Sequence, residues 1–255
     1  MIEYQSNPNK DPYANVMMQA FVTNASVGAI LNMVYLKPEP SPAAFSPFYP
    51  IPTTSDNTKI QTLTQMLSGQ LVPAIPRYVE STPPPKRQSI ETRRGRFDWF
   101  ATSFTPNASL YQEIASIAST APELQAIKSL TSGSLALGVQ PISASAVLAG
   151  HARGTNALGL EAVNQTWLVL DVGHWFRDGD EKAHDAARSI HSRIEDAARG
   201  NGNYLRYRFM NDASYDQRVI AHYGEESVEK LGVVRTRYDA DSVFQRLVTG
   251  GFKLP

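Results

Sequence analysis

The order of apolar and amphipathic segments along the chain constrains the fold more than any other feature of the sequence. Five segments are rich in Val, Ile, Leu and Phe and are short enough to be strands: residues 15–23, 27–35, 90–105, 133–142 and 166–176. The first two are separated by only three residues, which predicts a strand pair with a short turn. A helix is predicted after the third strand and another after the fifth. This order indicates an α+β fold with an antiparallel sheet and helices packed on one face.

Two segments show the spacing of apolar residues that is typical of a helix. One starts near Asn107 and continues through Leu124. The clearer one spans residues 181–199, and its predicted apolar face holds Ala183, Ala186, Ala187, Ile190 and Ile194. Residues 200–203 read GNGN and follow this helix, so we expect them to end it rather than to bind a phosphate. His184 and His191 lie seven positions apart on it, and we expect them on a solvated face.

The segments between the predicted strands are rich in proline and glycine. Residues 36–52 hold six prolines together with Phe45 and Phe48, which favours an extended connection packed on the protein. Residues 58–71 are expected to form a short amphipathic helix and residues 72–88 a proline-rich loop. The segment that contains Gly150 and Gly154 is also expected to be a loop.

Composition excludes several classes of function. Lys plus Arg and Asp plus Glu both number 24, so the chain lacks the net basic charge that nucleic acids and anionic membranes attract. There is no cysteine, which excludes disulfides and thiolate chemistry. The N-terminal sequence is polar and broken by proline, and no apolar run has the length of a membrane span. We therefore expect a cytoplasmic protein with no nucleic-acid or membrane partner.

Generic catalytic and nucleotide-binding motifs give no assignment. The sequence contains no GxGxxG or GxxxxGK[ST] phosphate loop and no GxSxG nucleophile elbow. It also contains no HExxH zinc motif, so no metal site is expected. The short basic cluster around Arg94 is expected to be a solvated strand end.

A family resemblance lies mainly in the second half of the chain. Its pieces are Gln140-Pro141-Ile142, Asn156-Ala157-Leu158-Gly159-Leu160, Met210-Asn211-Asp212-Ala213 followed by Gln217, Tyr223-Gly224-Glu225, Tyr238-Asp239, Val243-Phe244-Gln245 and Gly250-Gly251-Phe252-Lys253-Leu254. In this order and spacing they resemble the fungal branch of the FAD-linked oxidoreductases with a berberine-like C-terminus. Asp11-Pro12 and the proline-rich segment also fit, so the resemblance covers nearly the whole chain.

The resemblance implies a division of the chain and a cofactor. Residues 1–203 would form the substrate domain, and residues 204–255 the berberine-like C-terminal segment, which is expected to be helical. The FAD-binding half of the family would lie outside this chain. FAD is therefore the implied cofactor, but we expect this chain alone to bind it poorly or not at all.

The resemblance and the strand patterns also suggest site residues. Phe209-Met210-Asn211 occupies the place of the family's Tyr-x-Asn, which would put Asn211 and Phe209 beside the flavin; the family often has Tyr where this chain has Phe209. Strand alternation would place Tyr207 on the same face as these two residues. His174 and Tyr207 are the candidate acid–base residues. Three further residues are candidates for the substrate pocket: Gln140, Asn156 and Trp175.

Two functions from different classes remain open. The first is a truncated or split FAD-linked oxidoreductase of fungal secondary metabolism, which would oxidise a small organic metabolite by hydride transfer to flavin. The second is a cofactor-free cyclase or isomerase, similar to a pericyclase, that uses the same pocket by positioning and proton transfer. The expected partners are a small-molecule metabolite and either a second copy of the chain or a separate FAD-binding half.

Overall fold

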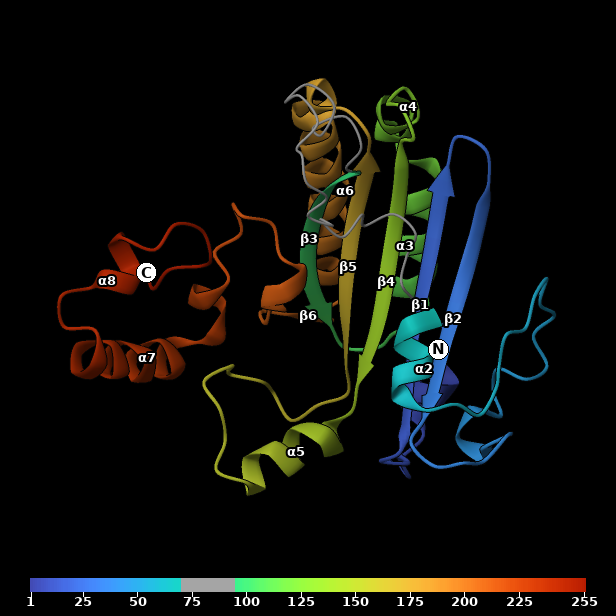
Figure 1. Cartoon of the computed structure of the whole chain (residues 1–255), viewed down its shortest axis with the longest axis horizontal. Coiled ribbons are helices and arrows are strands. Elements are labelled where there is room, and N and C mark those ends of the chain that lie inside the picture. Colours follow the sequence, from blue (N-terminus) through green and yellow to red (C-terminus); the bar gives the residue numbers. More distant parts are fainter. Residues whose placement is uncertain (70–94) are drawn as a thin grey trace, which may run out of the picture.

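A six-stranded antiparallel sheet forms the centre of the molecule. The computed structural model describes residues 1–69 and 95–255. The strands are β1 (Ala14–Thr23), β2 (Val27–Tyr35), β3 (Arg96–Phe104), β4 (Ser134–Ile142), β5 (Gln165–His174) and β6 (Tyr204–Leu205). They lie in the order β2-β1-β4-β5-β3-β6, and every neighbouring pair is antiparallel (Figure 1). The predicted α+β class and the predicted antiparallel sheet are confirmed.

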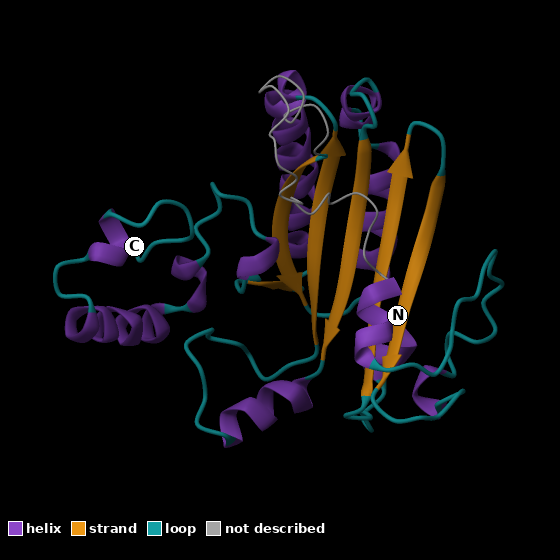
Figure 2. Cartoon of the chain, in the orientation of Figure 1, coloured by secondary structure: helices purple, strands orange, loops and turns teal. Residues whose placement is uncertain are grey.

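Three helices cover one face of this sheet. They are α3 (Ala108–Thr120), α4 (Glu123–Lys128) and α6 (Asp180–Gly200). In Figures 1 and 2, α3 and α6 lie behind the strands, and α4 lies at the upper end of β4. The remaining helices are α1 (Ile2–Ser6), α2 (Leu63–Gly69), α5 (Ala144–Ala152), α7 (Glu225–Tyr238) and α8 (Val243–Arg246), with short 3-10 turns at Ala43–Phe45, Arg177–Gly179, Met210–Asp212 and Ile220–Tyr223.

The main core lies between the sheet and α6. All five residues of the predicted apolar face of α6 are buried there: Ala183, Ala186, Ala187, Ile190 and Ile194. They pack against alternate residues of the central strands, including Leu137 and Leu170. The helix ends at Gly200, and Asn201 is its C-cap, as the GNGN sequence predicts.

Several predicted boundaries differ from the structure. The helix predicted through Leu124 breaks into α3 and α4, because Pro122 cannot continue α3. The prediction of a loop around Gly150 is wrong in part, since α5 runs through it with Ser143 as its N-cap. β5 ends at His174, two residues before the predicted end. The predicted loop at residues 72–88 lies outside the described residues.

The C-terminal part of the chain is helical and lies beside the β6 end of the sheet, as α7 and α8 show in Figure 1. A small apolar cluster joins it to the sheet, with Tyr207, Val219 and Tyr223 at its centre and Trp167 of β5 at its edge. The boundary between the two predicted domains, at residues 203 and 204, stays a prediction. Within the described ranges, no helix has both the length and the apolar character needed to span a membrane.

Candidate functional site

The face of the sheet opposite α6 carries the polar residues of interest. Along β5, Leu168, Leu170 and Val172 enter the core under α6. Alternation therefore turns Trp167 and Asp171 to the other side, which we call the front face. The front face also includes Trp99 of β3, whose Cα partner across the strands is Asp171, and Gln140 of β4, whose partner is Trp167.

Asp171 is the most unusual of these residues, because it is a carboxyl group in the centre of a sheet. Only 7% of its surface is exposed. Within residues 1–69 and 95–255, its side chain makes no hydrogen bond and no ion pair. Burial, together with the charge of nearby Asp212, raises the pKa of Asp171 to about 6.

Asp212 comes from a different part of the chain and meets the front face there. It ends the 3-10 turn Met210–Asp212, and its Oδ2 accepts a hydrogen bond from Gln140 Nε2 at 2.7 Å. Burial raises the pKa of Asp212, and the hydrogen bond from Gln140 opposes that rise. Gln140 thus ties the turn, and Asp212 with it, to β4.

Aromatic side chains form one wall beside the two carboxyl groups. Trp167 lies 4.8 Å from both Tyr207 and Phe209, measured between ring centroids. Tyr207 also stacks on Tyr223 at 5.6 Å with an interplanar angle of 16°. Burial raises the pKa of Tyr207 well above its ordinary range. Its phenol therefore stays protonated and can donate a hydrogen bond but is a poor base.

Asn211 borders a small cavity at the edge of the sheet. The cavity holds about 250 Å³ and is lined by Phe97, Asp98, Trp99, Asn211, Ala213, Ser214 and Tyr215. The Asn211 side chain is exposed to it and makes no hydrogen bond within the described part of the chain. Its amide can both donate and accept, so it suits a ligand edge that carries mixed donors and acceptors.

The segment that lines this cavity is fixed to β3 and α6 by side-chain hydrogen bonds. The Gln217 amide accepts from Ala101 N at 2.8 Å and donates to Ala101 O at 2.9 Å, so it continues the sheet where β6 stops. Gln217 Oε1 also accepts from Ser214 N at 3.0 Å. These contacts hold residues 211–217 against the edge strand.

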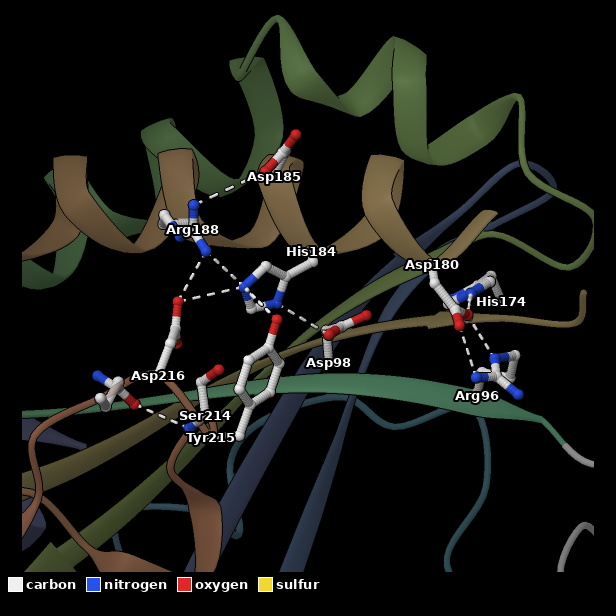
Figure 3. A network of polar contacts seen from close by, with 11 residues as sticks. Arg96, Asp98, His174, Asp180, His184, Asp185, Arg188, Ser214, Tyr215 and Asp216 are labelled. Carbon is white, nitrogen blue, oxygen red and sulfur yellow. Dashed lines mark hydrogen bonds and ion pairs between the residues drawn. The ribbon is translucent and has the colours of Figure 1, made fainter. Parts of the chain in front are cut away.

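A second set of polar contacts lies behind the same segment (Figure 3). His184 Nδ1 is 3.0 Å from Asp98 Oδ1, and Arg188 Nη2 is 2.7 Å from both His184 Nε2 and Asp216 Oδ2. His184 Nε2 also lies 3.2 Å from Asp216 Oδ2, so each ring nitrogen has a carboxylate oxygen within hydrogen-bond distance. The Tyr215 ring stacks on His184 at 5.0 Å. His184 thus joins β3, α6 and residues 215–216.

The prediction that His184 and His191 lie on a solvated face is wrong. Both are buried, and His191 Nε2 lies 3.2 Å from the carbonyl oxygen of Ala101. Both histidines are buried because the apolar stripe of α6 is wide enough to include them. Their polar ring atoms have hydrogen-bond partners on β3. In the described ranges, no group of three or more His, Asp or Glu side chains has the arrangement of a metal site.

The structure brings four of the seven predicted site residues together. Gln140, Tyr207, Phe209 and Asn211 all lie on or beside the front face. The chain that carries the last three is not the single strand that alternation assumed, because β6 ends at Leu205 and a 3-10 turn starts at Met210. Tyr207 and Phe209 nevertheless both contact Trp167, as their common parity predicted.

The other three predicted residues lie elsewhere. His174 is on the helix-covered side of the sheet, where its Nε2 is 3.0 Å from Asp180 Oδ1, and Asp180 is also held by Arg96. Asn156 is exposed, and its side chain accepts from Leu158 N at 3.0 Å. Trp175 follows the end of β5, where its backbone N donates to Thr131 O. The roles predicted for these three residues stay predictions.

Sequence reasoning missed the two carboxyl groups and two of the aromatic side chains, Trp99 and Trp167. Asp171 had a usable signal, since it is a single acid in the apolar strand sequence TWLVLDVGH and has the opposite parity to Leu170. Asp212 sits directly beside the predicted Asn211. Trp99 and Trp167 had no distinctive local pattern, because an aromatic residue in a strand is more often part of a core.

A larger cavity lies at the opposite edge of the sheet. It holds about 470 Å³ between the end of β2, the proline-rich segment and α2, and its lining includes Tyr35, Lys37, Glu39 and Lys59. None of the predicted site residues lines it. The smaller cavity is therefore the better candidate, because Asn211 borders it and Trp99 connects it to Asp171 across β3.

The fold is α+β, and its sheet carries acidic and aromatic side chains on the face opposite α6. The known proteins that are similar to this chain include several fungal proteins that are named FAD-dependent monooxygenases. The chain is 28% identical over 261 residues to bifunctional solanapyrone synthase of Alternaria solani, a match that covers 100% of this chain and 45% of that protein. It is 29% identical over 254 residues to an FAD-dependent monooxygenase of Arthrobotrys oligospora, over 99% of this chain and 45% of that protein.

A shorter match has a higher sequence identity. Over 120 residues the chain is 38% identical to an FAD-dependent monooxygenase of Fusarium proliferatum, which is 46% of this chain and 23% of that protein. The chain is thus a partial relative of fungal FAD-dependent monooxygenases, and it spans less than half the length of the relatives that it matches throughout. No protein-family model matches it, and no solved structure matches it.

Proposed function

We propose that this chain is the substrate-binding part of an FAD-linked oxidoreductase of fungal secondary metabolism. The observation that carries the proposal is the front face, which presents the buried carboxyl group of Asp171, the half-buried Asp212, a wall of aromatic rings and the exposed amide of Asn211. The similarity to fungal FAD-dependent enzymes supports FAD as the cofactor of the whole enzyme. The berberine-like character of residues 204–255 and the hydride transfer belong to this proposal as well.

The residues of the chain fit one part of FAD and not another. Asn211 offers an amide that has no partner within the described residues and lies beside an aromatic cavity, which suits the edge of a flavin ring. For the diphosphate, however, the sequence offers no glycine-rich loop. When bound, the flavin would accept a hydride from a carbon of the metabolite. The chain's own residues would position that carbon and exclude water from it.

The aromatic rings and the carboxyl groups define the pocket chemistry. Trp167, Tyr207 and Phe209 offer flat apolar surfaces, which suit a neutral organic metabolite with rings or conjugated bonds. The remaining exposed rings of the front face, at Phe97 and Trp99, are 54% and 40% exposed. We propose that a separate FAD-binding part covers them, with a second copy of the chain as the alternative cover.

A second candidate function has a specific observation in its favour. The alternative is a cofactor-free cyclase or isomerase that uses the same pocket. A carboxyl group with a pKa near 6, such as Asp171, is well suited to proton transfer near neutral pH. Proton transfer alone would need no flavin.

Visible absorption of the purified chain separates the two functions. The oxidoreductase proposal predicts a colourless chain that loses added FAD on desalting. It also predicts a stable yellow complex when the chain is purified together with the FAD-binding part of a relative, taken from outside the matched region. Conversion of a metabolite by the colourless chain under nitrogen would contradict this proposal and establish the cofactor-free function. Retention of FAD by the chain alone would contradict the assignment of the phosphate-binding part to a separate segment.

A further inference from the structure

The outer edge of β3 is paired over only part of its length. Its inner edge pairs with β5 from Arg96 to Phe104, whereas its outer edge pairs with β6 only at Ser103 and Phe104. Beyond β6, the amide of Gln217 accepts from Ala101 N at 2.8 Å and donates to Ala101 O at 2.9 Å. A primary amide carries an N–H and a C=O on one edge, so it satisfies both backbone groups of one strand residue.

The same outer edge continues past Ala101 without a partner. In an antiparallel sheet the N–H and the C=O of one residue point to the same edge, and the direction alternates along the strand. Because the backbone groups of Ala101 point outward, those of Trp99 and Phe97 point outward too. Within residues 1–69 and 95–255, no hydrogen bond reaches these outward groups of Trp99 and Phe97. Free backbone groups on an edge strand are a template for hydrogen bonding to another molecule.

A cavity opens at this unpaired stretch. The cavity of about 250 Å³ is lined by Phe97, Asp98 and Trp99 of β3. Alternation turns Asp98 to the helix side, where His184 contacts it, and turns the two aromatic residues to the front face. A cavity that contacts both kinds of residue lies at the edge of the strand rather than over one face of the sheet. Its far wall includes Asn211, which is exposed.

We propose that the outer edge of β3 at Trp99 binds a ligand that presents an N–H and a C=O side by side, as a lactam, a primary carboxamide or an imide does. The N–H of Trp99 donates to the ligand carbonyl, and the carbonyl of Trp99 accepts from the ligand N–H. This arrangement repeats the contact of Gln217 with Ala101, two residues or roughly 7 Å further along the strand.

Two sources can supply this chemistry. The flavin ring ends in an imide, and a metabolite can carry a lactam or a carboxamide. Either ligand rests on the proposed function above, whereas the binding of an amide edge at Trp99 rests on the strand geometry alone.

The lining of the cavity favours a neutral, flat group. Among the described residues that line it there is no Lys or Arg, and Asp98 contributes a carboxylate, so an anionic ligand is repelled. The exposed rings of Phe97 and Trp99 flank the edge and offer apolar surface to a ring. The cavity is smaller than the roughly 300 Å³ from which pockets for whole drug-sized ligands start. It therefore takes one ring or one amide group of a larger molecule.

The ligand class is tested on the purified chain with small probes, and binding is followed by the backbone amide signals in two-dimensional NMR. The lactam 2-piperidone should shift the Trp99 N–H signal to lower field. N-methyl-2-piperidone has no N–H and should bind roughly tenfold more weakly, because the carbonyl of Trp99 then has no donor. N-methylacetamide should also bind more weakly, because its trans amide places N–H and C=O on opposite sides. Equal binding of the three probes, or no shift at Trp99, would overturn the proposal.

Two variants separate the backbone of Trp99 from its side chain. Trp99→Ala and Trp99→Pro both remove the indole, but only proline removes the outward N–H, a change that an edge strand tolerates. Trp99→Ala should therefore bind 2-piperidone more tightly than Trp99→Pro, and equal binding by the two variants would contradict the proposal. If Trp99→Pro does not fold, the probe series on the unchanged chain decides alone.

Lumiflavin and 3-methyllumiflavin distinguish the two sources, since the methyl group blocks the imide N–H. A shift of the Trp99 N–H signal that lumiflavin gives and 3-methyllumiflavin does not give assigns the edge to the flavin. The same response to both flavins, together with binding of 2-piperidone, assigns it to the metabolite. Failure of the flavin-retention experiment above would not change the 2-piperidone series, so the two proposals fail independently.

Discussion

At the scale of single residues, the site depends on buried polar groups that differ in how many hydrogen bonds they make. Asp171 has no hydrogen bond within the described residues, whereas His184 has polar partners on both ring nitrogens. In the first arrangement, burial raises the pKa of the carboxyl group. The second arrangement fixes the protein around it. Replacement of Asp171 should therefore remove a loss of stability at neutral pH, whereas replacement of His184 should destabilise the folded chain.

Asp171→Asn should change how stability depends on pH. The folded-state pKa of Asp171 is raised to about 6, so the folded chain holds this proton more tightly than the unfolded chain, whose aspartates titrate near 4. Stability from this group is present below about pH 4 and is lost as pH rises through 6. The loss is on the order of 3 kcal/mol for a shift of about two pKa units. Urea unfolding at acidic and neutral pH should show this loss in the wild type and not in Asp171→Asn. An equal loss in both would contradict the prediction.

His184→Ala should destabilise the chain by about 2–3 kcal/mol, because it leaves Asp98 without its donor and opens a gap beside Phe100. The matched control is Asp185→Ala on the same turn of α6. Asp185 is exposed and its oxygen lies 3.8 Å from Arg188, so its loss should cost less than about 0.5 kcal/mol. Equal unfolding midpoints in urea for the two variants would show that the His184 contacts contribute nothing.

At the scale of elements, the sequence predicts those parts whose pattern is local. The pair β1–β2 follows from two apolar segments around a three-residue turn, and α6 follows from its stripe of alanines and isoleucines. The short helix α5 is not predicted because its own residues are small or apolar on every side of the helix. Its sequence therefore shows no separate apolar stripe. Residues 206–212 are not predicted either, since their course depends on contacts with Trp167 and Gln140 from distant strands.

Two glycines, one in α5 and one in the loop that follows it, should respond very differently to replacement by alanine. Gly159 has a φ of +64°, and a Cβ there would lie 1.8 Å from the carbonyl oxygen of Tyr223. Gly159→Ala should therefore cost about 2–5 kcal/mol, because both the backbone conformation and the contact are unfavourable. Gly150 lies in α5, where an added Cβ would meet no neighbouring atom within 4 Å, and Gly150→Ala should stabilise by about 0.5–1 kcal/mol. Thermal unfolding compares them, and similar melting temperatures would contradict the predicted contact with Tyr223.

At the scale of the whole molecule, the candidate site forms only where distant parts of the chain meet. Its residues come from β3, β4, β5 and the turn at Met210–Asp212, which are up to about a hundred residues apart in sequence. The family resemblance pointed to Asn211 because it carried this position over from complete enzymes, and the strand pattern pointed to Gln140. It did not find Asp171, whose importance is visible only once burial and the approach of Asp212 are known.

The central claim is that the front face is the small-molecule site of this chain. The three tryptophans test it directly, because their indole N–H signals are resolved by two-dimensional NMR and two of them lie on that face. Addition of lumiflavin, a flavin ring without phosphates, should shift the signals of Trp99 and Trp167 and the side-chain amide of Asn211. The signal of Trp175, beyond the end of β5, should stay in place. Shifts confined to the larger cavity around Tyr35 and Lys59, or no shift at Trp99 and Trp167, would contradict the claim.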